Sequence, residues 1–290
     1  MRLSTSDDLI HHEGYTHSYI EIMERLHKAG FRVLDLNLTD YQHDGSPFNG
    51  ENWRFWLEQI KKRADELGII FTQSHAPVYP FAEKEHYNEH MEDMMHRAFI
   101  ACGETHIPWL VIHISRPVNM TLEETIKLNT EYFKRMLIWA HKYNVGIAIE
   151  NLPQNSNTSQ KEWSSMFLSS PEALLSFVKG FNDDKIGVCI DVGHAMVQGW
   201  KIPYVIDLMG SDLKALHIQD GNGISDQHLP PYFGKMNWIE LMEALKRNKY
   251  SGDFTYEVCF PMRFAPTDIQ DKFYKLLVEL GEKLVCMGNE

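Results

Sequence analysis

Short apolar runs recur along the chain, and each is followed by a polar loop and then by a longer amphipathic stretch. The runs are continuous in hydrophobicity rather than alternating, which is typical of strands that are buried on both faces of a sheet. They lie at residues 2–5, 31–38, 69–75, 110–115, 146–151, 186–191, 213–218 and 254–258. We expect these runs to be buried β-strands.

The stretches between the runs repeat their apolar residues at the spacing of one helix face. We expect helices at residues 19–30, 53–68, 91–104, 125–143, 170–180, 203–210, 238–248 and 271–285. Several of these stretches end at glycine, a common residue after the last turn of a helix. Ser170 followed by Pro171 is typical of an N-cap and a first helical turn.

Strands that alternate with helices throughout a chain predict an all-parallel sheet, and eight such units can close into a barrel. The length of 290 residues is somewhat above the roughly 250 typical of such a barrel. A doubly wound open sheet is the alternative, and the number of units favours the barrel. We therefore predict an α/β fold with a single (β/α)8 TIM barrel domain over residues 1–290.

The composition argues against nucleic acid and membrane partners. Acidic residues outnumber basic ones by 40 to 28, giving a net charge of −12, whereas binding to a polyanion draws on lysine and arginine. No stretch approaches the 18 apolar residues of a membrane span, and the N-terminus lacks the apolar run of a signal peptide. The four cysteines lie far apart, as reduced thiols of a cytoplasmic protein do.

Histidine or carboxylate residues stand at or near the ends of six successive predicted strands. They are His75, His113, Glu150, Asp191, His217 and Glu257. Because parallel strands of a barrel all end at one face, where active sites of this fold are found, we expect these side chains to converge in one pocket. A single residue of this kind is more often a satisfied polar group or a helix cap, but six in succession point to a shared site.

The mixture of side chains predicts a divalent cation in that pocket. Three carboxylates buried together would repel one another and lose their hydration, and a cation offsets both costs. Carboxylate and imidazole ligands suit Mn, Co, Zn, Fe or Mg. We predict that Glu150, Asp191, His217 and Glu257 hold the cation.

Three further polar residues belong to the same mouth. His194 follows Asp191 by three positions, which places it in the loop just beyond the strand. Asp226 and His228 are separated by one residue, so an extended loop would point both side chains the same way. We expect them, with His75 and His113, to contact substrate or to bind a second cation.

Other histidine-rich stretches are expected to be solvated rather than functional. His11, His12 and His17 fall in an early loop and helix start. The stretch 82–97 is charged along its length, as the start of an exposed helix is.

Short motifs around the strand ends resemble those of the xylose isomerase-like barrel superfamily. The motifs are SHAP (74–77), VIHIS (111–115), IENLP (149–153), CIDVGHA (189–195), LHIQDGN (216–222), DQHLPP (226–231) and YEV (256–258). The superfamily includes sugar and sugar-phosphate isomerases, 3-epimerases of the tagatose and psicose kind, inosose dehydratases, hydroxypyruvate isomerases and endonuclease IV nucleases. The resemblance runs from about Arg2 to Val258.

Likeness to the epimerases implies that Glu150, Asp191, His217 and Glu257 are metal ligands and that His194 contacts substrate. It also implies that Glu150 and Glu257 move the proton while the cation stabilises an enediolate. This chain departs from the epimerases in two loops, since 151–157 lacks their second glutamate and 218–228 lacks their arginine. The common Gly-x-Gly after HLPP is also incomplete, since the chain reads YFGK (232–235) and keeps only Gly234. These departures argue against 3-epimerase activity on a free ketose and leave isomerase or epimerase chemistry on another polyol open.

The resemblance implies a metal-dependent isomerase or epimerase acting on a small sugar, sugar phosphate or related polyol. An inosose-type dehydratase is one alternative, and an endonuclease IV-like enzyme acting at abasic sites is another. The latter uses nine ligands for three zinc ions, and nine residues of the right types are present here: His75, His113, Glu150, Asp191, His194, His217, Asp226, His228 and Glu257. The acidic net charge argues against the nuclease. We expect a small polyhydroxy carbonyl substrate and leave a homo-oligomer open.

Overall fold

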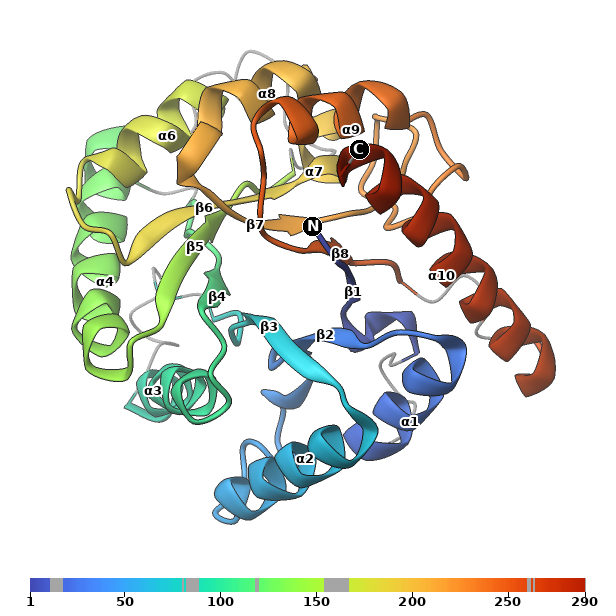
Figure 1. Cartoon of the computed structure of the whole chain (residues 1–290). Coiled ribbons are helices and arrows are strands. Elements are labelled where there is room, and N and C mark those ends of the chain that lie inside the picture. Colours follow the sequence, from blue (N-terminus) through green and yellow to red (C-terminus); the bar gives the residue numbers. More distant parts are fainter. Residues whose placement is uncertain are drawn as a thin grey trace.

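The computed structural model describes residues 1–10, 18–79, 81, 89–117, 120–153, 167–259, 262 and 264–289. The early histidines at 11–17, the stretch 82–88 and most of the loop after 153 lie outside these ranges. Eight parallel strands form one sheet that curls around a central axis (Figure 1). They are β1 (Leu3–Thr5), β2 (Val33–Asn37), β3 (Ile70–His75), β4 (Trp109–Ile112), β5 (Gly146–Glu150), β6 (Ile186–Asp191), β7 (Leu213–His217) and β8 (Phe254–Tyr256).

The two ends of this sheet meet and close it. Strand β1 pairs with β2 on one side, through Thr5 and Leu34, and with β8 on the other, through Leu3 and Phe254. Beyond the end of β7, Ile218 forms a parallel bridge with Tyr256 of β8. The predicted (β/α)8 barrel is thus confirmed over the open sheet.

Helices surround the barrel and cover the outer face of the sheet (Figure 1). They are α1 (Tyr19–Ala29), α2 (Trp53–Leu67), α3 (Glu89–Glu104), α4 (Leu122–Tyr143), α6 (Pro171–Lys179), α7 (Val192–Val197), α8 (Ile202–Met209), α9 (Trp238–Arg247) and α10 (Thr267–Asn289). Ser170 caps α6 by accepting a hydrogen bond from the Ala173 amide, as predicted. Short 3-10 turns, η1 (Asp7–Leu9) and η2 (Thr39–Tyr41), follow β1 and β2.

The helix α7 corrects one sequence prediction. His194 was expected in a loop, whereas it lies in this short helix and is only 5% exposed. The helix starts directly at the end of β6 because the Asp191 side chain caps it, accepting a hydrogen bond from the His194 amide at 2.6 Å. The strand-end aspartate therefore also fixes the backbone of the next site residue.

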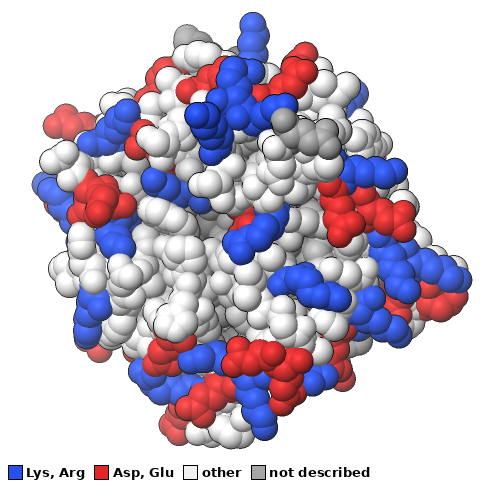
Figure 2. Space-filling view, in the orientation of Figure 1, with Lys and Arg blue, Asp and Glu red and all other residues white. Residues whose placement is uncertain are grey.

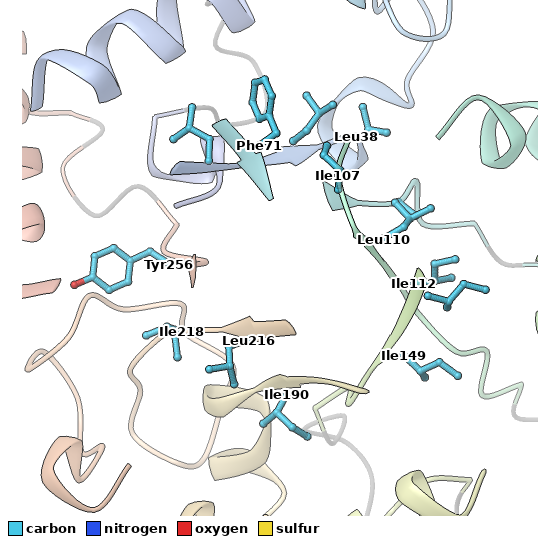
Figure 3. Packing of buried hydrophobic residues seen from close by; sticks show 14 of the residues in the cluster. Leu38, Phe71, Ile107, Leu110, Ile112, Ile149, Ile190, Leu216, Ile218 and Tyr256 are labelled. Carbon is cyan, nitrogen blue, oxygen red and sulfur yellow. The ribbon is translucent and has the colours of Figure 1, made fainter. Parts of the chain in front are cut away.

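Alternation along the strands divides the buried residues into an outer and an inner core. Large side chains such as Ile149, Ile190 and Leu216 pack between the sheet and the helices (Figure 3). The inner core is small, and consists of Val111, Ala148, Cys189 and Ala215. Each of these inner residues lies two positions before a site residue, so the site residues also point into the barrel. The small side chains of this inner core leave room inside the barrel for the polar site residues at the ends of the strands.

The opposite face of the barrel, where the strands begin, carries both chain ends and mixed charge (Figures 1 and 2). The N-terminal ammonium donates to the side chain of Asn289 at 2.9 Å. Arg2, one of the basic residues there, pairs with Asp253 at 2.9 Å. Among the described residues, no helix is both long enough and apolar enough to cross a bilayer.

Candidate metal centre

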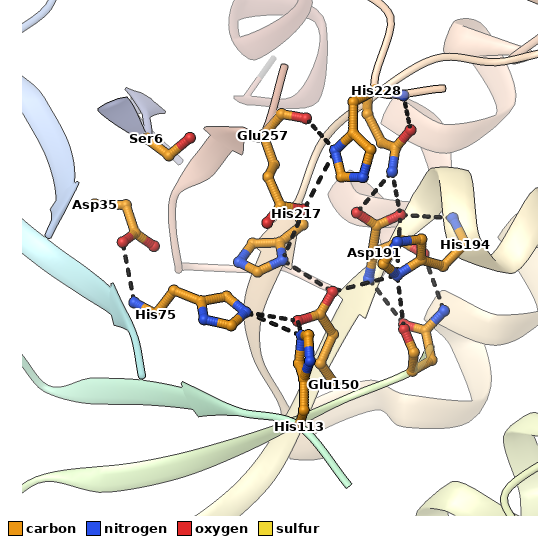
Figure 4. A network of polar contacts seen from close by, with 12 residues as sticks. Ser6, Asp35, His75, His113, Glu150, Asp191, His194, His217, His228 and Glu257 are labelled. Carbon is orange, nitrogen blue, oxygen red and sulfur yellow. Dashed lines mark hydrogen bonds and ion pairs between the residues drawn. The ribbon is translucent and has the colours of Figure 1, made fainter. Parts of the chain in front are cut away.

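All nine residues singled out from the sequence come together where the strands end, and Figure 4 labels all of them except Asp226. His113 and Glu257 lie one residue past β4 and β8, and the others lie at strand ends or in the following segments. The nine form three groups whose ligand atoms lie within 4.8 Å of one another: Glu150 with Asp191, His217 and Glu257; His75 with His113 and Glu150; and His194 with Asp226 and His228. Glu150 belongs to two of the groups.

Glu150 is the hub of the centre, fully buried at the end of β5. Its Oε2 lies 3.0 Å from Nε2 of His113 and 3.3 Å from Nε2 of His75. Its Oε1 lies 3.1 Å from Nδ1 of His217 and 3.3 Å from Nδ1 of His194. Figure 4 shows these histidines arranged around the carboxylate. One carboxylate therefore faces four imidazole rings.

Three buried atoms at this hub have no hydrogen-bond partner in the described part of the chain. They are Oε1 of Glu150, Nδ1 of His217 and Oε2 of Glu257. They lie only 3.1 and 3.2 Å apart across His217, within ion-pair distance but without the geometry of a hydrogen bond. Buried polar atoms are nearly always satisfied, so orphaned oxygen and nitrogen atoms that face one another fit a shared divalent cation. Asp191 offers a fourth possible ligand oxygen within 4.8 Å of these atoms.

The group of His194, Asp226 and His228 also has the geometry of a ligand set. Both rings direct Nε2 at Oδ2 of Asp226, each at 3.2 Å. Their Nδ1 atoms lie 2.9 Å from backbone carbonyls, those of Asn151 and Glu257 respectively. A carbonyl that holds one ring nitrogen fixes the tautomer and leaves the other nitrogen for a metal or a substrate.

The predicted convergence of Asp226 and His228 is confirmed, but the extended loop assumed for it is wrong. His228 has a left-handed backbone with φ of 47°. Its amide donates to Oε1 of Gln219 at 2.8 Å, and its carbonyl accepts from the Cys259 amide at 3.1 Å. Hydrogen bonds on both sides of the residue hold this uncommon conformation.

His75 and His113 occupy the other side of the hub. Their Nε2 atoms lie 3.0 Å apart. Nδ1 of His75 is 2.8 Å from both the Thr39 hydroxyl and the Ala76 carbonyl. Below the ring, buried Asp35 accepts a hydrogen bond from the His75 amide at 3.1 Å. The ring is therefore fixed with Nε2 toward Glu150.

In the group of His194, Asp226 and His228, the neighbouring carboxylates keep both histidines protonated when no cation is bound. Burial acts to lower the pKa of His194, but Asp191 and Asp226 raise it well above the ordinary value. Burial is likewise outweighed at His228, where Asp226 and Glu257 raise the pKa to about 10. A cation at these nitrogens would have to displace protons.

The carboxylates of the hub differ in their titration. Burial acts to raise the pKa of Glu150, but His217 and His113 lower it well below the ordinary value. His217 also outweighs burial at Glu257 and lowers that pKa to about 2. Burial dominates at Asp191 and raises its pKa to about 7. Glu257 is therefore ionised at neutral pH and is a candidate base.

Two amide side chains that the sequence reading did not single out hold the ligands in place. Gln219 donates from Nε2 to Asp191, at 3.1 and 3.2 Å, and to Asp226 at 3.0 Å. Asn151 donates to the Asp191 carbonyl at 3.1 Å and accepts from the Asp191 amide at 2.8 Å. In the sequence, Asn151 follows Glu150 by one residue and Gln219 follows His217 by two. This closeness to site residues was the only signal for their role, and it is weak because amide side chains are common in loops.

Buried Asp220 organises the loop that carries Asp226 and His228. One of its oxygens accepts from the amides of Gly221 and Met236 at 2.8 and 2.9 Å. The other accepts from the Tyr232 amide at 3.0 Å and the Trp238 indole at 3.3 Å. Four donors from both ends of the loop thus meet at one carboxylate.

We expect Asp220→Ala to lower the free energy of unfolding by about 3 kcal/mol, because it leaves four donors without their acceptor. Urea unfolding followed by circular dichroism measures the change. Asp220→Asn keeps one acceptor oxygen and should lose less. Equal stability of wild type and Asp220→Ala would show that water satisfies these donors and that Asp220 does not hold the loop.

Comparison with known proteins agrees with this arrangement. Residues 23–272 match a family model described as xylose isomerase-like TIM barrel. An uncharacterized protein of Methanocaldococcus jannaschii is 28% identical over 240 residues, covering 81% of this chain and 77% of its own length.

Two solved structures share the fold over nearly their whole length. One is D-psicose 3-epimerase with D-tagatose from Clostridium cellulolyticum H10, with a TM-score of 0.75 and 15% identity, covering 98% of this chain and 99% of that one. The other is the IolI protein with a bound zinc atom, with a TM-score of 0.74 and 17% identity, covering 99% of this chain and 98% of that one. At these identities the likeness establishes the fold.

Proposed function

The chain belongs to the xylose isomerase-like TIM barrel family, and on that premise we propose that it is a metal-dependent isomerase or epimerase of a small polyhydroxy carbonyl compound. A sugar, a sugar phosphate or a related polyol is the substrate class. Glu150, Asp191, His217 and Glu257 would hold the cation. The carrying observation is the set of orphaned buried atoms on Glu150, His217 and Glu257.

The donor set supports this chemistry. Carboxylate and imidazole ligands together suit Mn, Co, Zn or Fe better than an all-oxygen site would. A bound cation supplies Lewis acid chemistry, polarising a carbonyl and stabilising negative charge on an enediolate. The IolI structure, which contains zinc, supports metal binding on this fold.

The residues of the chain would carry the proton. The Glu257 side chain is 15% exposed against 1% for Glu150, so Glu257 is the carboxylate that opens toward the mouth. We assign Glu257 to take the proton from the carbon next to the carbonyl. Glu150, on the far side of His217, is the second carboxylate for the proton's return. His194 and His228 would donate hydrogen bonds to substrate hydroxyls.

Solvent exchange tests this function. Protein loaded with Mn²⁺ is incubated in D₂O with a panel of free and phosphorylated ketoses and inososes, and the sugars are analysed by mass spectrometry and NMR. We expect deuterium at the carbon next to the carbonyl, with an isomer or epimer as product. Turnover without deuterium, or no exchange in any panel member, would overturn proton transfer, and loss of water would indicate a dehydratase.

Cation binding is expected to release protons at neutral pH. The raised pKa values of His194 and His217 mean that these rings carry protons there when no cation is bound, and a ligand nitrogen must be deprotonated. Apparent affinity should therefore rise with pH as these protons are lost. Calorimetry of Zn²⁺ binding at pH 7 in buffers with different ionisation enthalpies measures the number released, and a value of zero would contradict the charged histidines.

An abasic-site nuclease is the second candidate, favoured by the three ligand groups into which the nine residues fall. Such an enzyme predicts three cations per chain and nicking of a duplex that contains an abasic site. The net charge of −12 argues against it. Metal analysis together with a gel assay of the abasic duplex distinguishes the two candidates.

A further inference from the structure

A separate acidic group lies where β1 and β2 end. Asp7 and Asp8 belong to η1, and Asp40 belongs to η2. Because β1 and β2 are paired neighbours, the two turns meet on one side of the mouth. Figure 4 labels Ser6, the residue before Asp7, on the same side of the centre as Asp35 and His75. The acidic group shares no residue with the three ligand groups around Glu150.

The three carboxylates approach one another closely. Each offers one oxygen, and these oxygens lie within 4.8 Å of one another. Asp8 is held in place, since its oxygens accept hydrogen bonds from the Ser6 hydroxyl at 2.7 Å and from the side-chain amide of Asn37 at 3.1 Å. Like charges at this separation repel one another unless a cation or a proton lies between them.

The burial of Asp7 is a second, independent observation that points to a ligand at this group. It is 1% exposed, and neither of its carboxylate oxygens forms a hydrogen bond of normal geometry among the described residues, although the Tyr41 hydroxyl lies close to it. Burial first, and then the charges of Asp40 and Asp8, raise the pKa of Asp7 well above its ordinary value. A buried carboxylate without donors is costly because it has lost its hydration, and a bound cation offsets that cost.

We propose that Asp7, Asp8 and Asp40 bind a hard divalent cation, Ca²⁺ or Mg²⁺, at a site separate from the centre around Glu150. The described donors are all oxygen atoms, which these ions prefer, whereas the nitrogen-containing centre suits transition metals. Ca–O bonds of about 2.3–2.6 Å place ligand oxygens at most about 5 Å apart, so three oxygens within 4.8 Å of one another can share one ion.

A cation at this site would stabilise η1 and η2 and also the neighbouring centre around Glu150. Thr39, the residue before Asp40 in η2, lies 2.8 Å from Nδ1 of His75 through its hydroxyl, which also donates to the Ala76 carbonyl at 2.9 Å. A cation that ties η2 to η1 therefore limits the movement of the hydroxyl that orients His75. Its role is positional, because the contacts described for Asp7 and Asp8 do not reach the hub around Glu150.

Calorimetry on the full chain tests the proposal. Chelator-treated protein is reloaded with one equivalent of Mn²⁺ and titrated with Ca²⁺. We expect one additional equivalent to bind, and Tm to rise by about 5 °C when free Ca²⁺ is about 100 times its Kd. Asp7→Asn, which keeps the side-chain shape, should lose the Ca²⁺ heat and the rise in Tm. The matched control is Asp44→Asn, which removes an exposed carboxylate from the β2–α2 loop and should retain both.

Two further variants make every outcome decisive. Glu150→Gln should retain Ca²⁺ binding. If Glu150→Gln instead loses the Ca²⁺ heat while Asp7→Asn retains it, the ion belongs to the centre around Glu150 and the proposal is overturned. Unchanged Ca²⁺ binding in Asp7→Asn would also overturn it. If Asp7→Asn fails to fold, Asp40→Asn, which alters a less buried side chain, gives the same comparison. Because the readout is Ca²⁺ binding, failure here leaves the proposed isomerase untouched.

Discussion

Glu257→Gln is expected to lower kcat by about 10²–10⁴-fold and to abolish deuterium incorporation from solvent. Glutamine keeps the size of the side chain and one ligand oxygen but cannot accept the proton. The wild-type side chain is ionised at neutral pH, because His217 lowers the pKa of Glu257 to about 2. Quenched-flow turnover and mass spectrometry of the sugar measure the two losses.

Glu150→Gln should have an equally large effect, with an added loss of metal affinity, because four imidazoles face this carboxylate. Metal analysis separates the two causes, since Glu257→Gln should keep more cation than Glu150→Gln. Exposed Glu243→Gln on α9 is the matched control and should retain full activity. Full turnover by either site variant would remove that residue from the proton-transfer role.

Removal of the cation is expected to abolish activity and to lower Tm by about 10 °C. The ligand contribution to folding is RT ln(1 + [L]/Kd), about 4 kcal/mol at 1,000 times Kd, and each kcal/mol shifts Tm by about 2–4 °C in a chain of this size class. Dialysis against a chelator, followed by scanning calorimetry and an activity assay, measures both losses. Mn²⁺, Co²⁺ or Zn²⁺ should restore them.

The metal-free protein should also lose stability as pH rises. The folded pKa of His228 is about 10, above the ordinary value of 6.5. A raised pKa stabilises the fold fully below about pH 6.5, and this contribution disappears as pH rises toward 10. The cation replaces the protons, so the metal-loaded protein should show a weaker dependence. A stability of the chelated protein that rises between pH 7 and 10 would contradict the charged state of these rings.

Most of the barrel could be read from the chain because its signals are local. Continuous apolar runs mark the buried strands, and a one-residue alternation separates outward Ile149 from inward Ala148 and Glu150. That parity, together with the common face of parallel strand ends, brings His75 and Glu257 to one mouth although they are far apart in the chain. The extent of the domain and the oligomeric state stay predictions.

Other features depended on how segments meet in space. His194 lies in a helix because Asp191 caps it, and His228 faces Asp226 because Gln219 holds a left-handed backbone there. Neither effect produces a periodic pattern in the sequence, because each depends on a hydrogen bond between a side chain and one particular backbone atom.

The sequence by itself determined the barrel, its mouth and the nine polar residues there, because periodicity and strand order fix which way each side chain points. Only the tertiary structure decided that Glu150 is the hub, and that Asp7 joins Asp8 and Asp40 in a separate acidic group. The reason is physical. Distances between side chains from different strands depend on barrel closure, stagger and loop path, which arise from long-range pairing and are not written in any local pattern.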